Sequence, residues 1–430
     1  MLQLIDYTVN KGPSNVLVPE EGDFKAQKVL IINTRSYHSD LLDHERTNRA
    51  RDQKVEGSGE VSTGPQLLQE NRRSKAERAV RAVKREQQAP VQAAGGSGGR
   101  TNSVPIVDNE DISACNTFLE IIRQNDDLWK EGVPNFDVVQ VPTLHLSADQ
   151  TVNEWAELAY LIEKNYHKYT GFVISHGTDT VVYIATALSF MLENLGKPII
   201  FTGSLIPAEC IYTDMKRNLI LSLMVANCRQ LTEVCILFDD TLYRANRCIK
   251  VSRGSLRPYD SPHFPPLAVM EGAMRLLGPL LRPQPHGKLR VMPHMDTKVL
   301  VLELGPCTPL DALLLAVETT QAKAVILACY GSGNAPSRGH FMPQLIQKAQ
   351  ARHLLVVVTT QNRYGSVNLR EYELGRRLLE LGAVGAGNMT QEATFVKLKY
   401  LFGIGLSAET VRSYLTKDLR GEISDVSPKL

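Results

Sequence analysis

The sequence predicts an α/β protein: a larger N-terminal domain in which helices cover both faces of a mainly parallel sheet, followed by a smaller C-terminal α/β domain. Two observations lead to this prediction. From about residue 111 onward, short apolar strands alternate with stretches that repeat apolar residues every three or four positions. A proline-rich passage over residues 257–285 interrupts this alternation, which then resumes.

The elements of the N-terminal domain follow from these two periodicities. The first strand, residues 28–33, is a β-branched run typical of a buried parallel strand. A further helix begins after Thr151, where a hydroxyl side chain precedes a face formed by Trp155, Leu158 and their neighbours. The other predicted strands are 137–141, 171–175, 197–202 and 233–238, and the other predicted helices are 111–124, 181–195 and 216–227.

The C-terminal domain shows the same alternation on a smaller scale. Its predicted strands are 299–304, 324–328 and 354–359, and its predicted helices are 309–320, 342–352, 371–381 and 390–402. Such sheets bind ligands at the carboxyl ends of their strands, so the turns at that edge are where chemistry is expected.

One segment departs from the α/β pattern. Residues 39–103 are charged, glutamine-rich and poor in aromatics, which predicts a disordered insertion. Within it, residues 66–88 have helix-forming composition and seven basic side chains, as in a solvated transient helix or in a surface that docks on an acidic partner or RNA; that partner is unknown. We therefore expect an N-terminal domain over 28–270 interrupted by this insertion, a proline-rich linker over 271–296 and the C-terminal domain over 297–425.

Composition excludes several classes of function. The 430 residues include 48 Lys and Arg against 46 Asp and Glu, and this near balance argues against nucleic acid as the main partner. The seven cysteines form no C-x-x-C pair and have no histidine at metal-ligand spacing, so we expect no metal site and no disulfide framework. No secretory signal and no apolar run of membrane-spanning length is present, so we expect a cytoplasmic protein without a membrane partner.

Polar residues follow several of the predicted strands. Ser175, His176, Thr178 and Asp179 lie between an apolar strand and an amphipathic helix, where free backbone N–H groups favour an anionic substrate or an oxyanion. The alternative is that Thr178 or Asp179 only caps the helix. Thr202 ends the next strand, and further on Lys250 is the type of residue that, when desolvated, acts as a base toward a threonine nucleophile. A solvent-exposed charge is the alternative for Lys250.

These residues resemble those of a known family. His-Gly-Thr-Asp-Thr at 176–180, with Thr-Gly-Ser-Leu-Ile-Pro at 202–207, Asp214 and Asn218, resembles the second signature region of bacterial-type L-asparaginases. The likeness is to the cytoplasmic type I enzymes and to animal asparaginase/lysophospholipase proteins. Further similar segments are 244–250, 330–336, 387–403 and 415–422.

The resemblance implies a reaction and its residues. It implies hydrolysis of the asparagine side-chain amide to aspartate and ammonia through an acyl-enzyme ester, with no cofactor and no metal, in a homodimer or homotetramer that takes asparagine or aspartate as its small-molecule ligand. It implies a proton-relay triad of Thr178, Asp179 and Lys250, and a substrate-binding set of Ser147 for the α-carboxylate, His176, Gly177, Thr202, and Asn334 from the second domain.

One motif departs from the family pattern. The family ends its first strand with Thr-Gly-Gly-Thr-Ile, which supplies the primary threonine nucleophile. Here the corresponding residues run from Thr34 to Tyr37, so only the first threonine remains and Tyr37 occupies the nucleophile position. A phenol has an unperturbed pKa near 10 and is bulkier than a threonine side chain.

Three interpretations follow from this departure. The chain is a working asparaginase with a different nucleophile, such as Thr178, Thr34 or Ser36, and with slow turnover; or it is a catalytically inactive homologue that binds an amino acid or serves as a subunit partner. A third interpretation is that residues 35–105 derive from an alternative or misassigned exon.

Overall fold

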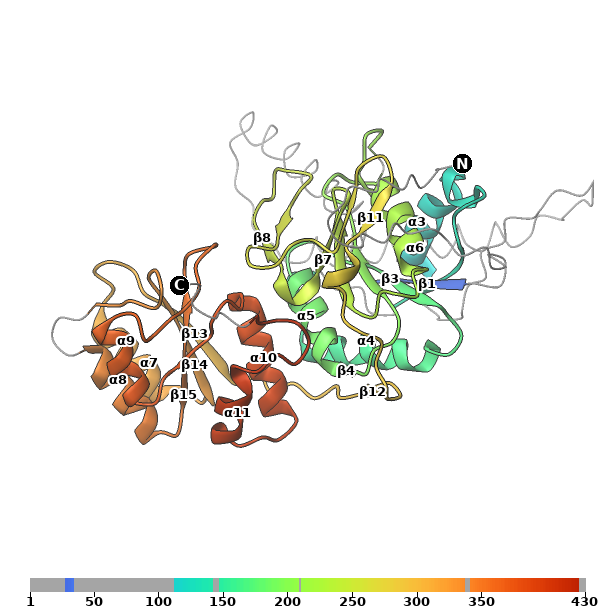
Figure 1. Ribbon diagram of the computed structural model, residues 1–430. Coiled ribbons are helices and arrows are strands. Elements are labelled where there is room, and N and C mark those ends of the chain that lie inside the picture. Colours follow the sequence, from blue (N-terminus) through green and yellow to red (C-terminus); the bar gives the residue numbers. More distant parts are fainter. Residues whose placement is uncertain (1–27, 35–111, 142–146, 209, 337–340, 425–430) are drawn as a thin grey trace, which may run out of the picture. The chain divides into compact units, whose positions relative to one another are not determined.

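The computed structural model of the chain describes residues 28–34, 112–141, 147–208, 210–336 and 341–424 (Figure 1). The predicted insertion at 39–103, its basic helix at 66–88 and Tyr37 lie outside these residues. No helix within the described ranges has the length and apolar character needed to cross a membrane.

The N-terminal domain is built on one large sheet. Its strands lie in the order β11 (Met274–Leu276), β10 (Ala268–Met270), β7 (Thr241–Arg244), β6 (Val234–Phe238), β5 (Ile199–Thr202), β3 (Gly171–Ser175), β1 (Lys28–Asn33) and β2 (Asn135–Gln140). The strands from β6 to β2 are parallel, whereas β7, β10 and β11 are antiparallel additions at one edge. The predicted fold class is confirmed.

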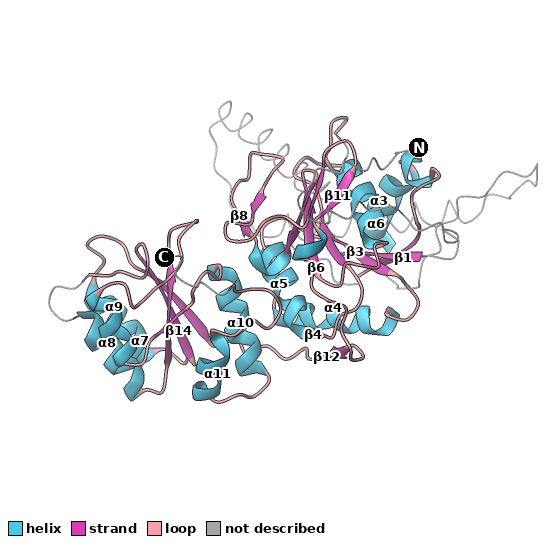
Figure 2. Cartoon of the chain, in the orientation of Figure 1, coloured by secondary structure: helices cyan, strands magenta, loops and turns pink. Residues whose placement is uncertain are grey.

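Helices cover this sheet on both faces, as Figure 2 shows. They are α3 (Ile112–Arg123), α4 (Val152–Asn165), α5 (Val181–Met191) and α6 (Met215–Ala226). Because side chains alternate along a strand, Leu30 and Ile32 share one apolar core with α4 and α5. Helix α4 begins where predicted, since Thr151 and Glu154 form a capping box.

The proline-rich passage forms more of the N-terminal domain than expected. Residues 271–296 were predicted to be a linker, but β11 lies within them and continues the large sheet as a hairpin with β10. Gly272 makes the tight turn of this hairpin with a φ of 81°, a conformation that glycine adopts without strain. Farther along, β12 (Arg290–Val291) pairs with β4 (Leu192–Glu193), so α5 ends at Met191 rather than at residue 195.

The C-terminal domain is a four-stranded parallel sheet with helices on both faces (Figure 1). Its strands are β13 (Val299–Glu303), β14 (Ala324–Cys329), β15 (Leu355–Thr360) and β16 (Val384–Gly385). Its helices are α7 (Leu310–Thr319), α8 (Phe341–Ala351), α9 (Glu373–Glu380), α10 (Gln391–Gly403) and α11 (Ala408–Leu415). Helix α10 contacts both this sheet and α5, so the two domains share one apolar core.

Candidate active site

Three strands bring their carboxyl ends to one edge of the large sheet. Asn33, Ser175 and Thr202 lie level in the register of β1, β3 and β5. The chain after each strand stays paired, because the Thr34 N–H donates to the Ser175 carbonyl at 3.0 Å and the His176 N–H donates to the Thr202 carbonyl at 2.9 Å. Thr34 and His176, the first residues after β1 and β3, therefore lie beside Ser175 and Thr202 at the carboxyl edge of the parallel sheet.

Lys250 reaches the turn after β3 from a different part of the chain. It lies in β8 (Ile249–Lys250), and its Nζ donates to Thr178 Oγ1 at 3.0 Å and to Asp179 Oδ1 at 2.6 Å. The ribbon partner of β8 is β9 (Tyr259–Asp260), and the Tyr259 hydroxyl donates to the Thr178 carbonyl at 2.7 Å. The hydroxyl, carboxylate and ammonium groups predicted to form a relay are thus in direct contact.

This cluster is open to solvent on one side. The Asp179 side chain is 71% exposed and the Lys250 side chain 21% exposed, so the carboxylate faces water while the ammonium group is largely covered. The nearby Cys248 offers no rival nucleophile, because burial raises the pKa of its thiol well above the ordinary value.

Ser147 lies against the same turn. It begins the short 3₁₀ helix η2 (Ser147–Asp149), and its carbonyl accepts a hydrogen bond from Thr180 Oγ1 at 2.7 Å. A Cβ added at Gly177 would lie 2.6 Å from Ser147 Oγ, so only glycine permits this approach. The predicted carboxylate-binding serine and Gly177 are therefore neighbours.

His176 has a different environment from the one expected of a substrate ligand. Its ring has no exposed surface, Nδ1 lies 2.7 Å from the Gly177 carbonyl, and Nε2 lies 2.8 Å from the side-chain amide of Gln150. The imidazole thus joins the η2 turn to the turn after β3. The sequence analysis did not identify Gln150 as a site residue. Its position three residues after Ser147 was the signal that could have indicated it.

Two other predicted ligands lie outside the exposed cluster. Thr202 is fully buried and its hydroxyl donates to the Leu237 carbonyl at 3.1 Å, so it joins β5 to β6. Asn334 lies in the turn after β14, where its side chain accepts from the Ala335 N–H at 3.0 Å and its backbone pairs with Tyr330. Neither contacts Thr178, Asp179 or Lys250.

Asp214 and Asn218 of the signature motif support the turn after β5. The Asp214 carboxylate accepts from the N–H groups of Leu205 and Ile206, and Asn218 Nδ2 donates to the Gly203 carbonyl at 3.0 Å. Both residues satisfy backbone groups that the tight turn leaves unpaired.

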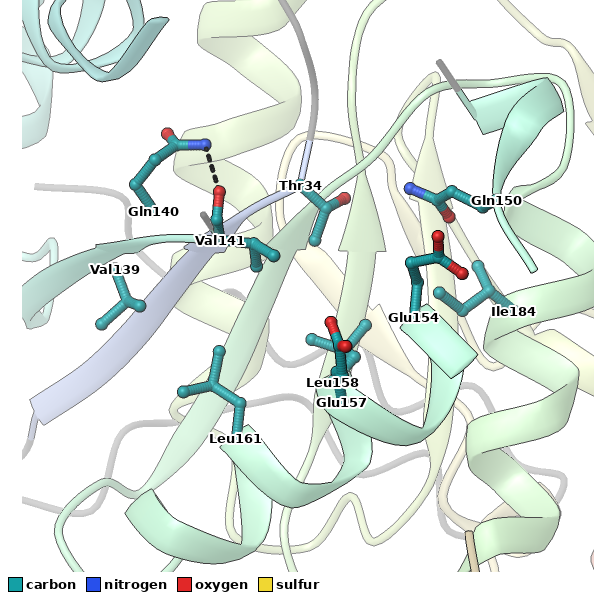
Figure 3. Close-up of a pocket in the computed structure, with 10 residues that line it drawn as sticks. All are labelled: Thr34, Val139, Gln140, Val141, Gln150, Glu154, Glu157, Leu158, Leu161 and Ile184. Atoms are coloured by element: carbon teal, nitrogen blue, oxygen red, sulfur yellow. Dashed lines mark hydrogen bonds between the residues drawn. The ribbon is translucent and has the colours of Figure 1, made fainter. Parts of the chain in front are cut away.

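Thr34, the surviving threonine of the first motif, is nearly buried. Its hydroxyl donates to the Ser175 carbonyl at 2.9 Å. The residue also lines a pocket of about 180 Å³ together with Glu154, Glu157 and Gln150. Figure 3 shows that the lining side chains come from the ends of β1 and β2, from Gln150 ahead of α4, and from α4 and α5.

A second pocket, of about 290 Å³, is lined by residues of both domains. Lys250 and His263 line it from the N-terminal domain, and Gln361, Asn362 and Glu392 line it from the C-terminal domain. Burial is the main cause that lowers the pKa of His263. Lys250 therefore contacts both the signature turn and this junction of the two domains. Among the described residues, no cluster of three or more His, Cys, Asp or Glu side chains is arranged to hold a metal ion.

Comparison with known proteins identifies the family. Residues 99–280 match the family model described as Asparaginase, N-terminal, and residues 298–415 match the Glutaminase/Asparaginase C-terminal domain. L-asparaginase 1 of Escherichia coli K12 is 39% identical over 292 residues, which cover 68% of this chain and 86% of that protein. The 60 kDa lysophospholipase of Mus musculus is 35% identical over 67% of this chain, which spans about half (51%) of that longer protein.

The fold gives the same result. The crystal structure of L-asparaginase I from Vibrio cholerae superposes with a TM-score of 0.67 at 32% identity, covering 74% of this chain and 95% of that one. The resemblance was stated on motifs spread over both domains, and it is confirmed. These motifs are 176–180, 202–207, Asp214, Asn218, 244–250, 330–336, 387–403 and 415–422. The chain belongs to the asparaginase family.

Proposed function

We propose that the protein is an L-asparaginase-type amidohydrolase, which converts L-asparagine and water to L-aspartate and ammonia with Thr178, Asp179 and Lys250 as its reacting groups. The observation that supports this proposal is the pair of hydrogen bonds from Lys250 Nζ to Thr178 Oγ1 and to Asp179 Oδ1. A helix-capping role for Thr178 or Asp179 would not need a lysine from another part of the chain. Helix α5 has no side-chain cap of its own.

The proposed reaction uses Thr178 as the nucleophile. As Oγ1 attacks the amide carbon, the hydroxyl proton passes by way of Lys250 Nζ to the departing ammonia. Water then hydrolyses the resulting ester to release aspartate. Asp179 orients the lysine and stabilises its ammonium form. Thr34 is a weaker candidate, because its hydroxyl proton is already donated to the Ser175 carbonyl.

Substrate selection would involve the Ser147 turn. A serine hydroxyl beside Gly177, next to the first free N–H groups of α5, suits a carboxylate. We propose that Ser147 holds the substrate α-carboxylate and that His176, through Gln150, keeps this turn in place.

The test is ammonia release from L-asparagine by the full chain. Lys250→Ala and Thr178→Val should each lower kcat by about 10³-fold or more, because a nucleophile and its base act as a unit. Lys164→Ala, at an exposed lysine in α4, is the matched control and should leave kcat unchanged. Full activity in Thr178→Val together with its loss in Tyr37→Phe would assign the attack to the phenol instead.

A second function is favoured by one observation, the tyrosine at the family's nucleophile position. In this case the protein is a catalytically inactive homologue that binds aspartate or asparagine, or that serves as a subunit partner. Calorimetry discriminates between the two functions: aspartate binding without ammonia release supports the second, whereas turnover that Lys250→Ala abolishes supports the first.

We also propose that the protein works as a cytoplasmic homo-oligomer. Asn334 is exposed and contacts none of the three reacting groups of its own chain, which is consistent with a role in the site of a neighbouring subunit. Sedimentation velocity of the full chain should give a dimer or tetramer, and a monomer at micromolar concentration would contradict this proposal.

A further inference from the structure

A third pocket lies away from the candidate active site, beside the amino end of β6. Its volume is about 380 Å³, and it is lined from the N-terminal domain by Thr232, Arg244 and Asn246, from the passage after β11 by Arg282, and from the C-terminal segment by Arg420. We call it the arginine pocket. None of the proposed reacting residues, Thr178, Asp179 and Lys250, lines this pocket.

The wall of the arginine pocket is fixed by a buried ion pair. Arg244 Nε donates to Glu233 Oε2 at 2.5 Å, and these two side chains are 6% and 2% exposed. Arg244 Nη2 also donates to the Leu280 carbonyl at 2.8 Å, and Glu233 Oε1 accepts from the Arg282 N–H at 2.8 Å. The carboxylate of Glu233 balances the charge of Arg244, and both side chains are hydrogen-bonded. This ion pair therefore forms a rigid polar wall of the pocket.

Two polar groups of the arginine pocket have no partner within the described part of the chain. Asn246 is 1% exposed, and while its Nδ2 donates to the Arg420 carbonyl at 2.9 Å, its Oδ1 accepts no hydrogen bond. The buried Nε of Arg420 donates to nothing. Buried groups of this kind cost free energy unless a ligand or water satisfies them. They offer one acceptor and one cationic donor.

The charges around the pocket leave a small positive excess. Three arginines line it against one lining carboxylate, that of Glu233. Two further carboxylates lie near: Asp418 is 3.7 Å from Arg282, and Glu193 is 3.6 Å from Arg420 and also paired with Arg290. Counted together, four arginines face three carboxylates, an excess of one positive charge. A singly charged anion matches this excess better than a phosphate dianion.

We propose that the arginine pocket binds a small hydroxycarboxylate. Its carboxylate would lie against the guanidinium groups of Arg282 and Arg420, and a hydroxyl would donate to Asn246 Oδ1. A hydroxyl suits this position better than an ammonium group, which would add a cation beside three arginines. The proposal is independent of the proposed amidohydrolase activity, because the two sites share no residue.

The test is isothermal titration of the full chain with D-gluconate, a monoanion with several hydroxyl groups. Hexanoate, of the same charge and chain length but without hydroxyls, is the matched probe. Gluconate should bind once per chain with a Kd of about 1 mM or tighter, and hexanoate should bind at least about tenfold more weakly. Equal affinity for the two probes, no gluconate binding at about 10 mM, or tighter binding of inorganic phosphate would each overturn the proposal.

A pair of arginine variants locates the bound gluconate. Arg282 is suitable because its side chain is 33% exposed and its structural hydrogen bond to Glu233 comes from the backbone. Arg282→Gln should weaken gluconate binding about tenfold, whereas Arg275→Gln, at an exposed position of β11, should leave it unchanged. Unchanged binding in a folded Arg282→Gln chain would overturn the assignment to this pocket. The comparison of gluconate with hexanoate on the unaltered chain is a second test that no folding defect can affect.

Discussion

Gly177 lies so close to Ser147 that no side chain fits between them. An added Cβ would lie 2.6 Å from Ser147 Oγ and 2.7 Å from Ser147 Cβ, closer than real Cβ atoms come to their neighbours. The Ser147 turn would have to move, although Thr180 holds it by a hydrogen bond to the Ser147 carbonyl. At the residue scale, the position of Ser147, the residue proposed to bind the substrate carboxylate, therefore depends on the absence of a side chain at Gly177.

Gly177→Ala should weaken the affinity for L-aspartate by about tenfold or more, since it displaces the Ser147 hydroxyl while leaving the ionic groups in place. Calorimetry at neutral pH measures this change. Gly254→Ala is the matched control, because a Cβ there meets no atom within 4 Å, and it should bind aspartate as the unaltered chain does. Unchanged affinity in Gly177→Ala would remove Ser147 from the proposed binding set.

Helix α10 carries an ion pair that is completely buried. Lys397 Nζ lies 2.6 Å from Glu422 Oε1, and neither side chain has exposed surface. Lys397 also donates to the Leu415 and Lys417 carbonyls, and Glu422 accepts from the N–H groups of Leu419 and Arg420. At the scale of the element, this pair fixes the segment after α11 against α10.

Glu422→Gln should lower the free energy of unfolding by about 3–5 kcal/mol, because it leaves the Lys397 charge buried without its partner. Urea denaturation followed by circular dichroism measures the loss. Glu380→Gln, at an exposed position of α9, is the control and should change stability by no more than about 0.5 kcal/mol. Equal stability of the two variants would show that water reaches Lys397.

The same pair predicts a dependence on pH. Burial is the largest single cause acting on Glu422 and raises its pKa. The charge and hydrogen bond of Lys397, together with backbone N–H donors, outweigh burial, so the pKa of Glu422 lies below its ordinary value. A lowered carboxyl pKa adds stability above the unfolded value of 4.5, and this is lost as the pH falls through the folded value. The stability difference between the unaltered chain and Glu422→Gln should therefore shrink in acid. A difference that stays constant as the pH falls would contradict this assignment.

Arg247 connects the two domains at the scale of the whole molecule. It is 1% exposed in the 3₁₀ helix η3 (Ala245–Arg247), and it donates to the Gly421 carbonyl at 2.5 Å and to Ser424 Oγ at 2.7 Å. Burial lowers the pKa of Arg247 to about 10, which leaves the guanidinium charged at neutral pH. Together with the shared core around α10, this arginine couples the C-terminal segment to the N-terminal domain.

Arg247→Gln should reduce this coupling, because the shorter neutral side chain leaves buried carbonyl groups unsatisfied. We expect a loss of about 2–4 kcal/mol and a broadened or split calorimetric transition in place of a single one. Arg253→Gln, at an exposed loop position, should show the thermogram of the unaltered chain. A sharp transition at an unchanged Tm in Arg247→Gln would mean that the apolar core alone couples the domains.

Much of the fold could be predicted from local pattern. The strand at 171–175 was predicted residue for residue, and α4 begins directly after Thr151, because a period of two or of 3.6 and a capping box are properties of neighbouring residues. The hairpin of β10 and β11 was not predicted. Its strands have three residues each, too few to show a period, and the prolines before them suggested a linker.

The sequence by itself determined the α/β class, the family and the residue types of the candidate site, because motif order and periodicity depend only on the order of residues in the chain. Only the tertiary structure decided which of those residues meet. Lys250 lies 71 positions from Asp179 and contacts it only because the ribbon of β8 and β9 folds back to the sheet edge. Thr202 belongs to the same signature region, but its side chain is buried and hydrogen-bonded to the neighbouring strand. Distance in space depends on how strands pair and pack, and no local pattern contains that information.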